Sequence, residues 1–134
     1  RRKSKTMSTL SVATIKSASS AAPVFQNSSG TEKGQIIKAW INFNGQGTIA
    51  IRDSFNISSI TDLGVGRTRV TFDNAMSNAN FSVTASSGYS PTDALRSVGL
   101  YANFTTAKFE ILTRYGTDGA RDDQVVCCMA IGDN

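Results

Sequence analysis

Short runs of alternating apolar and polar residues begin at Ile36 and are separated by segments rich in Gly, Asn and Asp. A period of two is typical of antiparallel strands that bury one face. In 36–43 the side chains of Ile37, Ala39, Ile41 and Phe43 share one face, which predicts the first core strand. Further strands are predicted at Thr48–Ile51, at Phe55–Ile60 with a bulge, at Val70 and Phe72, at Phe81–Ala85, at Val98–Phe104, and at Phe109 and Ile111.

Two polar segments between these runs predict hairpins. Asp73–Asn80 separates the Phe72 strand from the Phe81 strand, and Thr105–Thr106 separates the Val98–Phe104 strand from Phe109. Each segment is short enough to join neighbouring antiparallel strands. The two connections are therefore expected to lie at the ends of paired strands.

The last apolar run, Val125–Ile131, has no polar face. Val125, Cys127, Met129 and Ile131 alternate with Val126, Cys128 and Ala130. Such a pattern predicts a strand buried on both sides. This strand is expected to be central in its sheet or covered by another subunit. The adjacent Cys127 and Cys128 point to opposite faces, which favours two small apolar side chains over a disulfide framework or a redox-active pair.

The segment before the strands has a different composition. Residues 8–33 are rich in Ser, Ala and Thr and carry few apolar side chains. The fold class predicted for the chain is all-β, an antiparallel β-sandwich or jelly-roll-like domain over 35–134 that follows an extended N-terminal arm. Residues 1–6 are expected to be a disordered basic leader, and 7–34 a docking arm. The arm's apolar side chains, the candidates for docking to a larger particle, are Leu10, Val12, Ile15, Val24 and Phe25.

The formal charge of +4 belongs to the N-terminal end. Four of the 14 basic residues are Arg1, Arg2, Lys3 and Lys5, which leaves ten basic residues against ten acidic ones. The strand-forming part thus has no general attraction to phosphate, and no specific nucleic-acid partner is predicted. No apolar stretch approaches the roughly 20 residues of a membrane span, so membrane insertion is not expected.

Histidine is absent, which removes the commonest general base and metal ligand. Catalysis would depend on carboxylates such as Asp93 with Asp122, whereas Glu110 alternates with apolar neighbours and is predicted to face solvent. No catalytic residue, metal or cofactor is predicted, and the chain is interpreted as a non-enzyme. The segment Gly64–Gly66 lacks the further residues of a phosphate-binding loop.

Two loops are the candidate ligand-binding segments. Tyr89 and Tyr115 lie in polar, Gly-containing segments, where an aromatic ring is available for ligand stacking or for anchoring the loop. The acidic loop around Asp118, Arg121 and Asp122 is either a solvated turn or a site for a hard cation. Trp40 and Tyr101, inside predicted strands, are expected to pack.

Several motifs resemble one family. The segment Lys38–Thr61 is similar to a motif that reads KAWVNFNG, then GTV-I, then SFNVSSIT in tail-fibre and other structural proteins of marine and cyanobacterial tailed phages. The similarity continues through 70–76, 80–83 and 130–134, and the arm segments 15–23 and 25–32 resemble the N-terminal part of short members. Residues 86–123 match no motif of this group.

The resemblance implies a part of a virion, assembled in the host cytoplasm. The leading hypothesis is a homotrimeric fibre or appendage that attaches to other virion proteins through the arm and exposes a β knob that binds host-surface glycan. The alternative is a capsid-decorating protein whose arm clasps neighbouring shell subunits. A third hypothesis is a carbohydrate-active enzyme. The sequence leaves open whether the protein belongs to the head or the tail.

Overall fold

The computed structural model describes residues 10–16, 23–88, 96–116 and 119–132, and every regular element in these ranges is a β-strand. Within them no helix is long and apolar enough to cross a membrane. The prediction of an all-β protein is therefore confirmed. The strands are β1 (Phe25–Gln26), β2 (Glu32–Gly34), β3 (Ala39–Asn44), β4 (Ala50–Phe55), β5 (Ile57–Asp62), β6 (Arg67–Phe72), β7 (Ser82–Gly88), β8 (Arg96–Thr105), β9 (Lys108–Tyr115) and β10 (Val125–Ile131).

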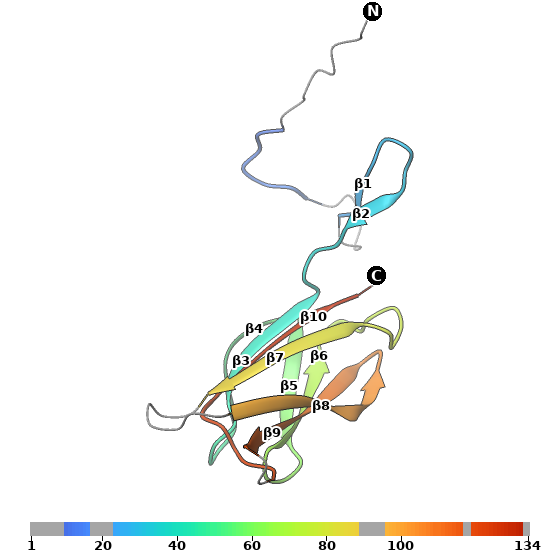
Figure 1. Ribbon diagram of the computed structural model, residues 1–134. Coiled ribbons are helices and arrows are strands. Elements are labelled where there is room, and N and C mark those ends of the chain that lie inside the picture. Colours follow the sequence, from blue (N-terminus) through green and yellow to red (C-terminus); the bar gives the residue numbers. More distant parts are fainter. Residues whose placement is uncertain (1–9, 17–22, 89–95, 117–118, 133–134) are drawn as a thin grey trace, which may run out of the picture.

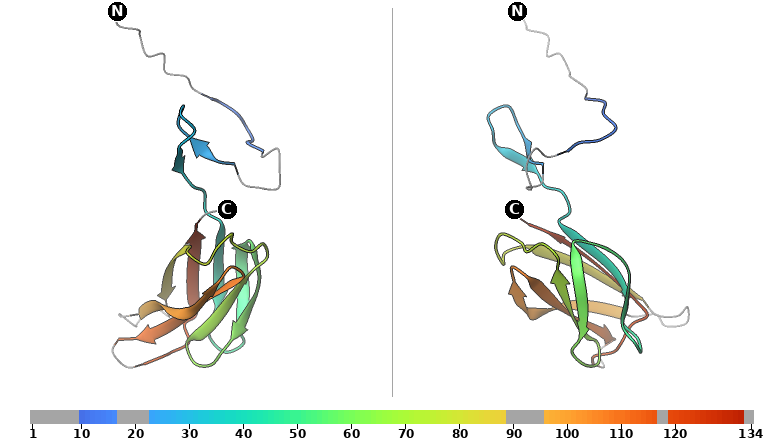
Figure 2. Two further views of the ribbon diagram at one scale, coloured as in Figure 1. Left: turned by 90° about the vertical axis from the view of Figure 1, so that its right-hand side faces the viewer. Right: turned by 180° about the vertical axis from the view of Figure 1, so that it is seen from behind.

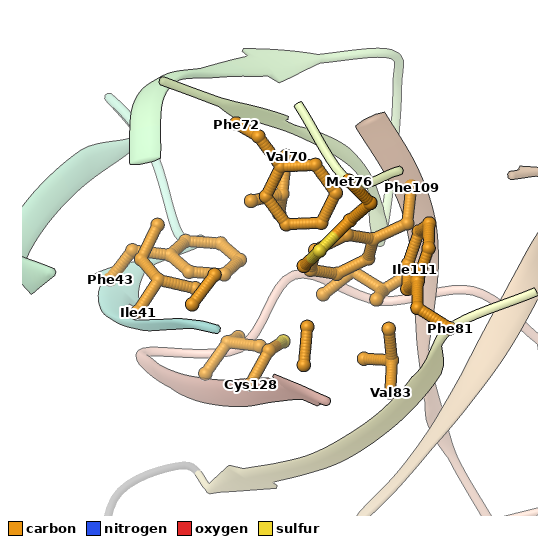
Figure 3. Packing of buried hydrophobic residues seen from close by; sticks show 13 residues of the cluster. Ile41, Phe43, Val70, Phe72, Met76, Phe81, Val83, Phe109, Ile111 and Cys128 are labelled. Carbon is orange, nitrogen blue, oxygen red and sulfur yellow. The ribbon is translucent and has the colours of Figure 1, made fainter. Parts of the chain in front are cut away.

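Eight of these strands form two antiparallel sheets (Figure 1). Sheet I has the order β4-β3-β10-β7, and sheet II has the order β5-β6-β9-β8. Side chains from both sheets contribute to one hydrophobic core, as Figure 3 shows for Ile41 and Cys128 of sheet I and Val70 and Ile111 of sheet II. Each sheet therefore has an inner face toward the core and an outer face away from it.

Aromatic rings fill much of the space between the sheets. The ring of Phe81 lies 5.3 Å from Phe72 and 5.1 Å from Phe104, measured between ring centroids. Phe109, on β9, is in ring contact with all three. Such edge-on and tilted pairs add about 0.5–1.5 kcal/mol each to the free energy gained from burying their apolar area. The cluster holds β6 and β9 of sheet II against the connection that leads into sheet I.

The predicted hairpin around Asp73–Asn80 is wrong. This segment leads from β6 in sheet II to β7 in sheet I, where β7 pairs with β10. Met76 and Phe81 of the connection are buried in the shared core. Alternation indicates which side chains of a strand are buried, but both sheets bury a face in the same core, so the pattern does not distinguish the two sheets. The hairpin across Thr105–Thr106 is confirmed as β8 and β9.

The final strand is central in its sheet, as predicted, while burial of its second face stays a prediction. β10 is central, between β3 and β7, and its inward Val126, Cys128 and Ala130 are buried. Its other face is open, because Val125, Met129 and Ile131 are exposed. Within this chain, therefore, the strand is buried on one side only.

The N-terminal part contains a hairpin that the sequence did not predict. β1 and β2 pair with each other and lie apart from the two larger sheets (Figures 1 and 2). The described arm side chains Leu10, Val12, Ile15, Val24 and Phe25 are all exposed. Ile37, predicted on the buried face of the first core strand, is also exposed and precedes β3.

Asn56 is the residue at which the chain passes from sheet I to sheet II. It has a φ of 56°, a conformation that Asn tolerates better than most residues. Its amide nitrogen donates to the carbonyls of Lys38 and Asn74, at 3.0 and 3.1 Å, and its side-chain oxygen accepts from the Asn74 N–H at 2.7 Å. The prediction of one strand through Phe55, Ile57 and Ile60 is wrong, because Phe55 ends β4 in sheet I and Ile57 begins β5 in sheet II. The predicted bulge between Ile57 and Ile60 is confirmed at Ile57–Ser59.

We predict that Asn56→Ala lowers the free energy of unfolding by about 2 kcal/mol, because it removes the four hydrogen bonds of the side chain and adds backbone strain. Urea denaturation followed by tryptophan fluorescence measures the change. Asn56→Gly keeps the backbone freedom and loses only the hydrogen bonds, so its effect should be smaller. Equal losses in the two variants would show that strain at this position is unimportant.

Candidate functional site

The predicted loop residues are partly brought together. Tyr89 and Asp118 lie outside the residues that the structure describes. The guanidinium carbon of Arg121 lies 5.6 Å from the ring centroid of Tyr115. A backbone bridge between Arg114 and Ala120 holds the two sides of this loop together. Tyr115 is half-buried in this arrangement, which matches the loop-anchoring alternative better than an open stacking platform.

The acidic residues of this loop have structural partners. The Asp122 carboxylate accepts a hydrogen bond of 2.6 Å from the Gly66 N–H in the β5–β6 turn. Asp123 is buried, and its backbone carbonyl accepts from the Gly45 N–H at 2.9 Å. Across the described ranges, no group of three or more Asp, Glu or Cys side chains is placed to hold a metal ion. The hydrogen bond from Gly66 to Asp122 links this loop to the turn before β6 of sheet II. Asp93, the other candidate carboxylate, lies outside the described residues.

The outer face of sheet I carries a row of apolar side chains across three strands. Phe55 on β4 pairs with Trp40 on β3, and Trp40 pairs with Met129 on β10. Phe55 is 55% exposed and Met129 is 46% exposed, while Trp40 is half-buried. Val125 and Ile131, two further outward side chains of β10, are also exposed. We call Trp40, Phe55, Val125, Met129 and Ile131 the outer apolar face.

The outer face of sheet II carries a charged cluster instead. Arg67 donates from Nε and Nη2 to one carboxylate oxygen of Glu110, at 3.2 and 2.7 Å. Arg69 donates in the same way to the other oxygen, at 3.1 and 2.9 Å. The Glu110 side chain is 0% exposed, whereas each arginine keeps 33% of its side chain exposed. The prediction that Glu110 faces solvent is therefore wrong: it is on the outer face, but the two arginines cover it.

This cluster keeps Glu110 ionised. Burial by itself raises the pKa of the carboxyl, but the hydrogen bonds from Arg67, Arg69 and Asn103 outweigh it and lower the pKa from 4.5 to about 2. The single carboxylate of Glu110 balances one of the two guanidinium charges. The cluster therefore carries a net positive charge at neutral pH.

Tyr101 and Asn103 complete the cluster from the neighbouring strand β8. The Arg67 guanidinium carbon lies 4.1 Å from the centroid of the Tyr101 ring, and the Asn103 amide nitrogen lies 3.3 Å from a Glu110 oxygen. Tyr101, expected to pack inside a strand, is 39% exposed on the outer face. This group was not predicted from the sequence. The alternation of Arg67 and Arg69 was the available signal, but nothing local indicated that Glu110 pairs with them.

The two cysteines follow the predicted arrangement. Cys128 is buried toward the core and Cys127 is half-buried on the other side, and both are free thiols. Burial raises the pKa of Cys128 to about 12, and the neighbouring Cys127 adds to the effect. The thiolate form is the reactive one, so Cys128 is a poor nucleophile.

Comparison with protein-family models, curated proteins and solved structures found no significant match for this chain.

Proposed function

We propose that this chain is a non-enzymatic structural protein of a tailed-phage virion. In this proposal residues 35–134 form a β-sandwich that assembles as a homotrimer, and residues 7–34 attach it to other virion proteins. The observation that carries the proposal is the outer apolar face of sheet I. The resemblance of the Lys38–Thr61 motif to phage fibre proteins gives the biological setting.

The position of the outer apolar face supports an assembly role. Phe55, Trp40 and Met129 form a continuous row across adjacent strands, because each is the registered partner of the next. β10 is central in sheet I, so the exposure of Met129 is not a consequence of lying at a sheet edge. Contiguous exposed apolar patches on soluble proteins mark interaction surfaces. A second copy that covers this row would bury the second face of β10.

The arm supports attachment to a larger particle. Its described apolar side chains are exposed, and the β1–β2 hairpin pairs only within itself among the described strands. A segment with so little apolar area of its own gains order chiefly by binding.

The same feature suits the capsid-decorating alternative, in which the arm clasps shell subunits. Gold labelling of the protein on intact virions decides between the two, since label on the tail supports a fibre and label on the head supports decoration.

Light scattering coupled to size-exclusion chromatography tests the assembly. The wild-type protein should elute with three times the 14.3 kDa chain mass at micromolar concentration. Met129→Asp should weaken assembly by at least about tenfold, because it places a charge at the centre of the outer apolar face. Ser59→Asp, on the exposed outer side of sheet II, is the matched control and should remain trimeric. A wild-type monomer, or a Met129→Asp variant that assembles normally, would contradict the proposal.

A further inference from the structure

The outer face of sheet II differs from that of sheet I in its charge. On the described strands, alternation places four basic side chains on it, Arg67, Arg69, Lys108 and Arg114, against the single carboxylate of Glu110. Glu110 offsets one of these charges. The face therefore carries an excess of positive charge that the chain as a whole, with its balanced composition beyond residue 5, does not have.

Glu110 holds Arg67 and Arg69 in place without using all of their hydrogen-bond donors. Each uses its Nε and Nη2 on Glu110, and the Nη1 groups have no hydrogen-bond partner in the part of the chain that the structure describes. Arg67 also makes a cation–π contact, with its guanidinium carbon 4.1 Å from the centroid of the Tyr101 ring. Two preoriented guanidinium groups of this kind match a planar carboxylate, because their N–H donors lie in fixed directions.

Tyr101 adds a different kind of contact beside these donors. Tyr101 is 39% exposed on the same face, and the amide of Asn103 lies next to the carboxylate that both arginines share. A tyrosine ring offers an apolar face and a polar edge, which suits a ligand that is partly apolar and partly hydroxylated. The side-chain oxygen of Asn103 is an acceptor for a hydroxyl group.

We propose that Arg67, Arg69, Tyr101 and Asn103 form a binding site for a carboxylate-bearing saccharide, such as a uronic or sialic acid unit of an acidic polysaccharide. The ligand's carboxylate binds the Nη1 edges of the two arginines, and its sugar ring packs beside Tyr101. Glu110 is a positioning residue that holds the arginines. The inference deepens the proposed function by naming the ligand of the exposed domain, and it moves that ligand from the loops at Tyr89 and Tyr115 to a sheet face.

A saccharide suits this face better than a nucleic acid. Binding a nucleic-acid strand depends on several phosphates spaced along a basic track, and most of its affinity comes from that net charge. Here Glu110 holds the two central arginines side by side. Their remaining donors suit one planar anion better than a repeating phosphate chain.

Titration calorimetry tests the site with three probes: oligogalacturonate, alginate oligosaccharide and a sialylated oligosaccharide. At least one should bind, and its neutral methyl ester should bind about tenfold more weakly or worse. Tyr101→Ala should weaken binding by about tenfold, and Arg69→Lys, which keeps the charge but loses the paired donors, by a similar factor. Leu100→Ala changes an exposed neighbour on the other side of β8 and should leave binding unchanged.

Circular dichroism of each variant confirms that it is folded, and Tyr101→Ala keeps the test decisive if Arg69→Lys unfolds. The proposal is overturned if no probe binds at about 10 mM, if the methyl ester binds as well as the acid, or if Tyr101→Ala has no effect. Tighter binding of single-stranded DNA than of every saccharide would also overturn it. Light scattering reports assembly and calorimetry reports binding, so a failure of this site is distinguishable from a failure of the proposed assembly.

Discussion

Replacing Glu110 with glutamine should lower the free energy of unfolding by about 3 kcal/mol at neutral pH. The substitution keeps the size of the side chain and removes its charge. Arg67 and Arg69, which now share one carboxylate, would then repel each other across a buried neutral amide. Removing one partner of a buried ion pair is costly because the charges that remain are uncompensated.

The same substitution should change the dependence of stability on pH. The folded-state pKa of Glu110, about 2, lies below its ordinary value of 4.5. The stabilisation from the ionised carboxylate is therefore fully present above pH 4.5 and is lost as the pH falls toward 2. The difference in stability between wild type and Glu110→Gln should be largest at pH 7 and should shrink steadily between pH 4.5 and pH 2.

Urea denaturation at a series of pH values measures this difference. The matched control replaces the whole cluster with apolar side chains, as Arg67→Met, Glu110→Leu and Arg69→Met together. This triple variant should be close to wild type in stability, because it removes the charges along with their pairing. A Glu110→Gln protein as stable as wild type at pH 7 would show that the cluster adds nothing to folding.

Gly66→Ala should be at least as damaging and should lower the free energy of unfolding by about 3 kcal/mol or more. Gly66 has a φ of 69° in the β5–β6 turn, and a Cβ atom there would lie 2.6 Å from both the Thr113 carbonyl oxygen and the Arg121 nitrogen. These are backbone atoms that hydrogen-bond to each other at 3.0 Å, so they cannot move aside as a flexible side chain would. The alanine therefore has to displace the loop that carries Asp122.

Gly47→Ala is the control for the effect of backbone conformation alone. Gly47 has nearly the same φ, 65°, but a Cβ atom there would meet nothing within 4 Å. Its substitution should cost only about 1 kcal/mol. Thermal denaturation compares the two variants, and hydrogen exchange at the Thr113 and Arg121 amides shows whether the loop is displaced. Equal destabilisation by the two substitutions would mean that the close approach at Gly66 is unimportant.

Much of the strand assignment was predictable from local pattern. The alternation of Ala39, Ile41 and Phe43 correctly identified β3 and its buried face. The hairpin of β8 and β9 was also predictable, because its two strands are neighbours in the sequence. Burial of one face imposes a period of two on the residues of a strand, so this information is present within each short segment.

The candidate sites could not be predicted in the same way. Arg67 and Arg69 meet Glu110 across more than 40 positions of sequence, because β6 pairs with β9. The wrong hairpin between β6 and β7 shows the same limit, since nothing local indicates which of two sheets a strand joins. The predicted ligand loops were chosen for their polar composition, and the structure shows that Asp122 is used to anchor its loop.

The sequence by itself determined that the chain forms strands, which side chains of most strands are buried, and that the N-terminal segment has little apolar area of its own. Only the tertiary structure decided that one face of β10 is open and that Glu110 is enclosed by two arginines. The reason is physical. A period of two shows that one face of a strand is buried, but it does not identify the element that covers that face. The partners of a strand are set by long-range packing of the two sheets.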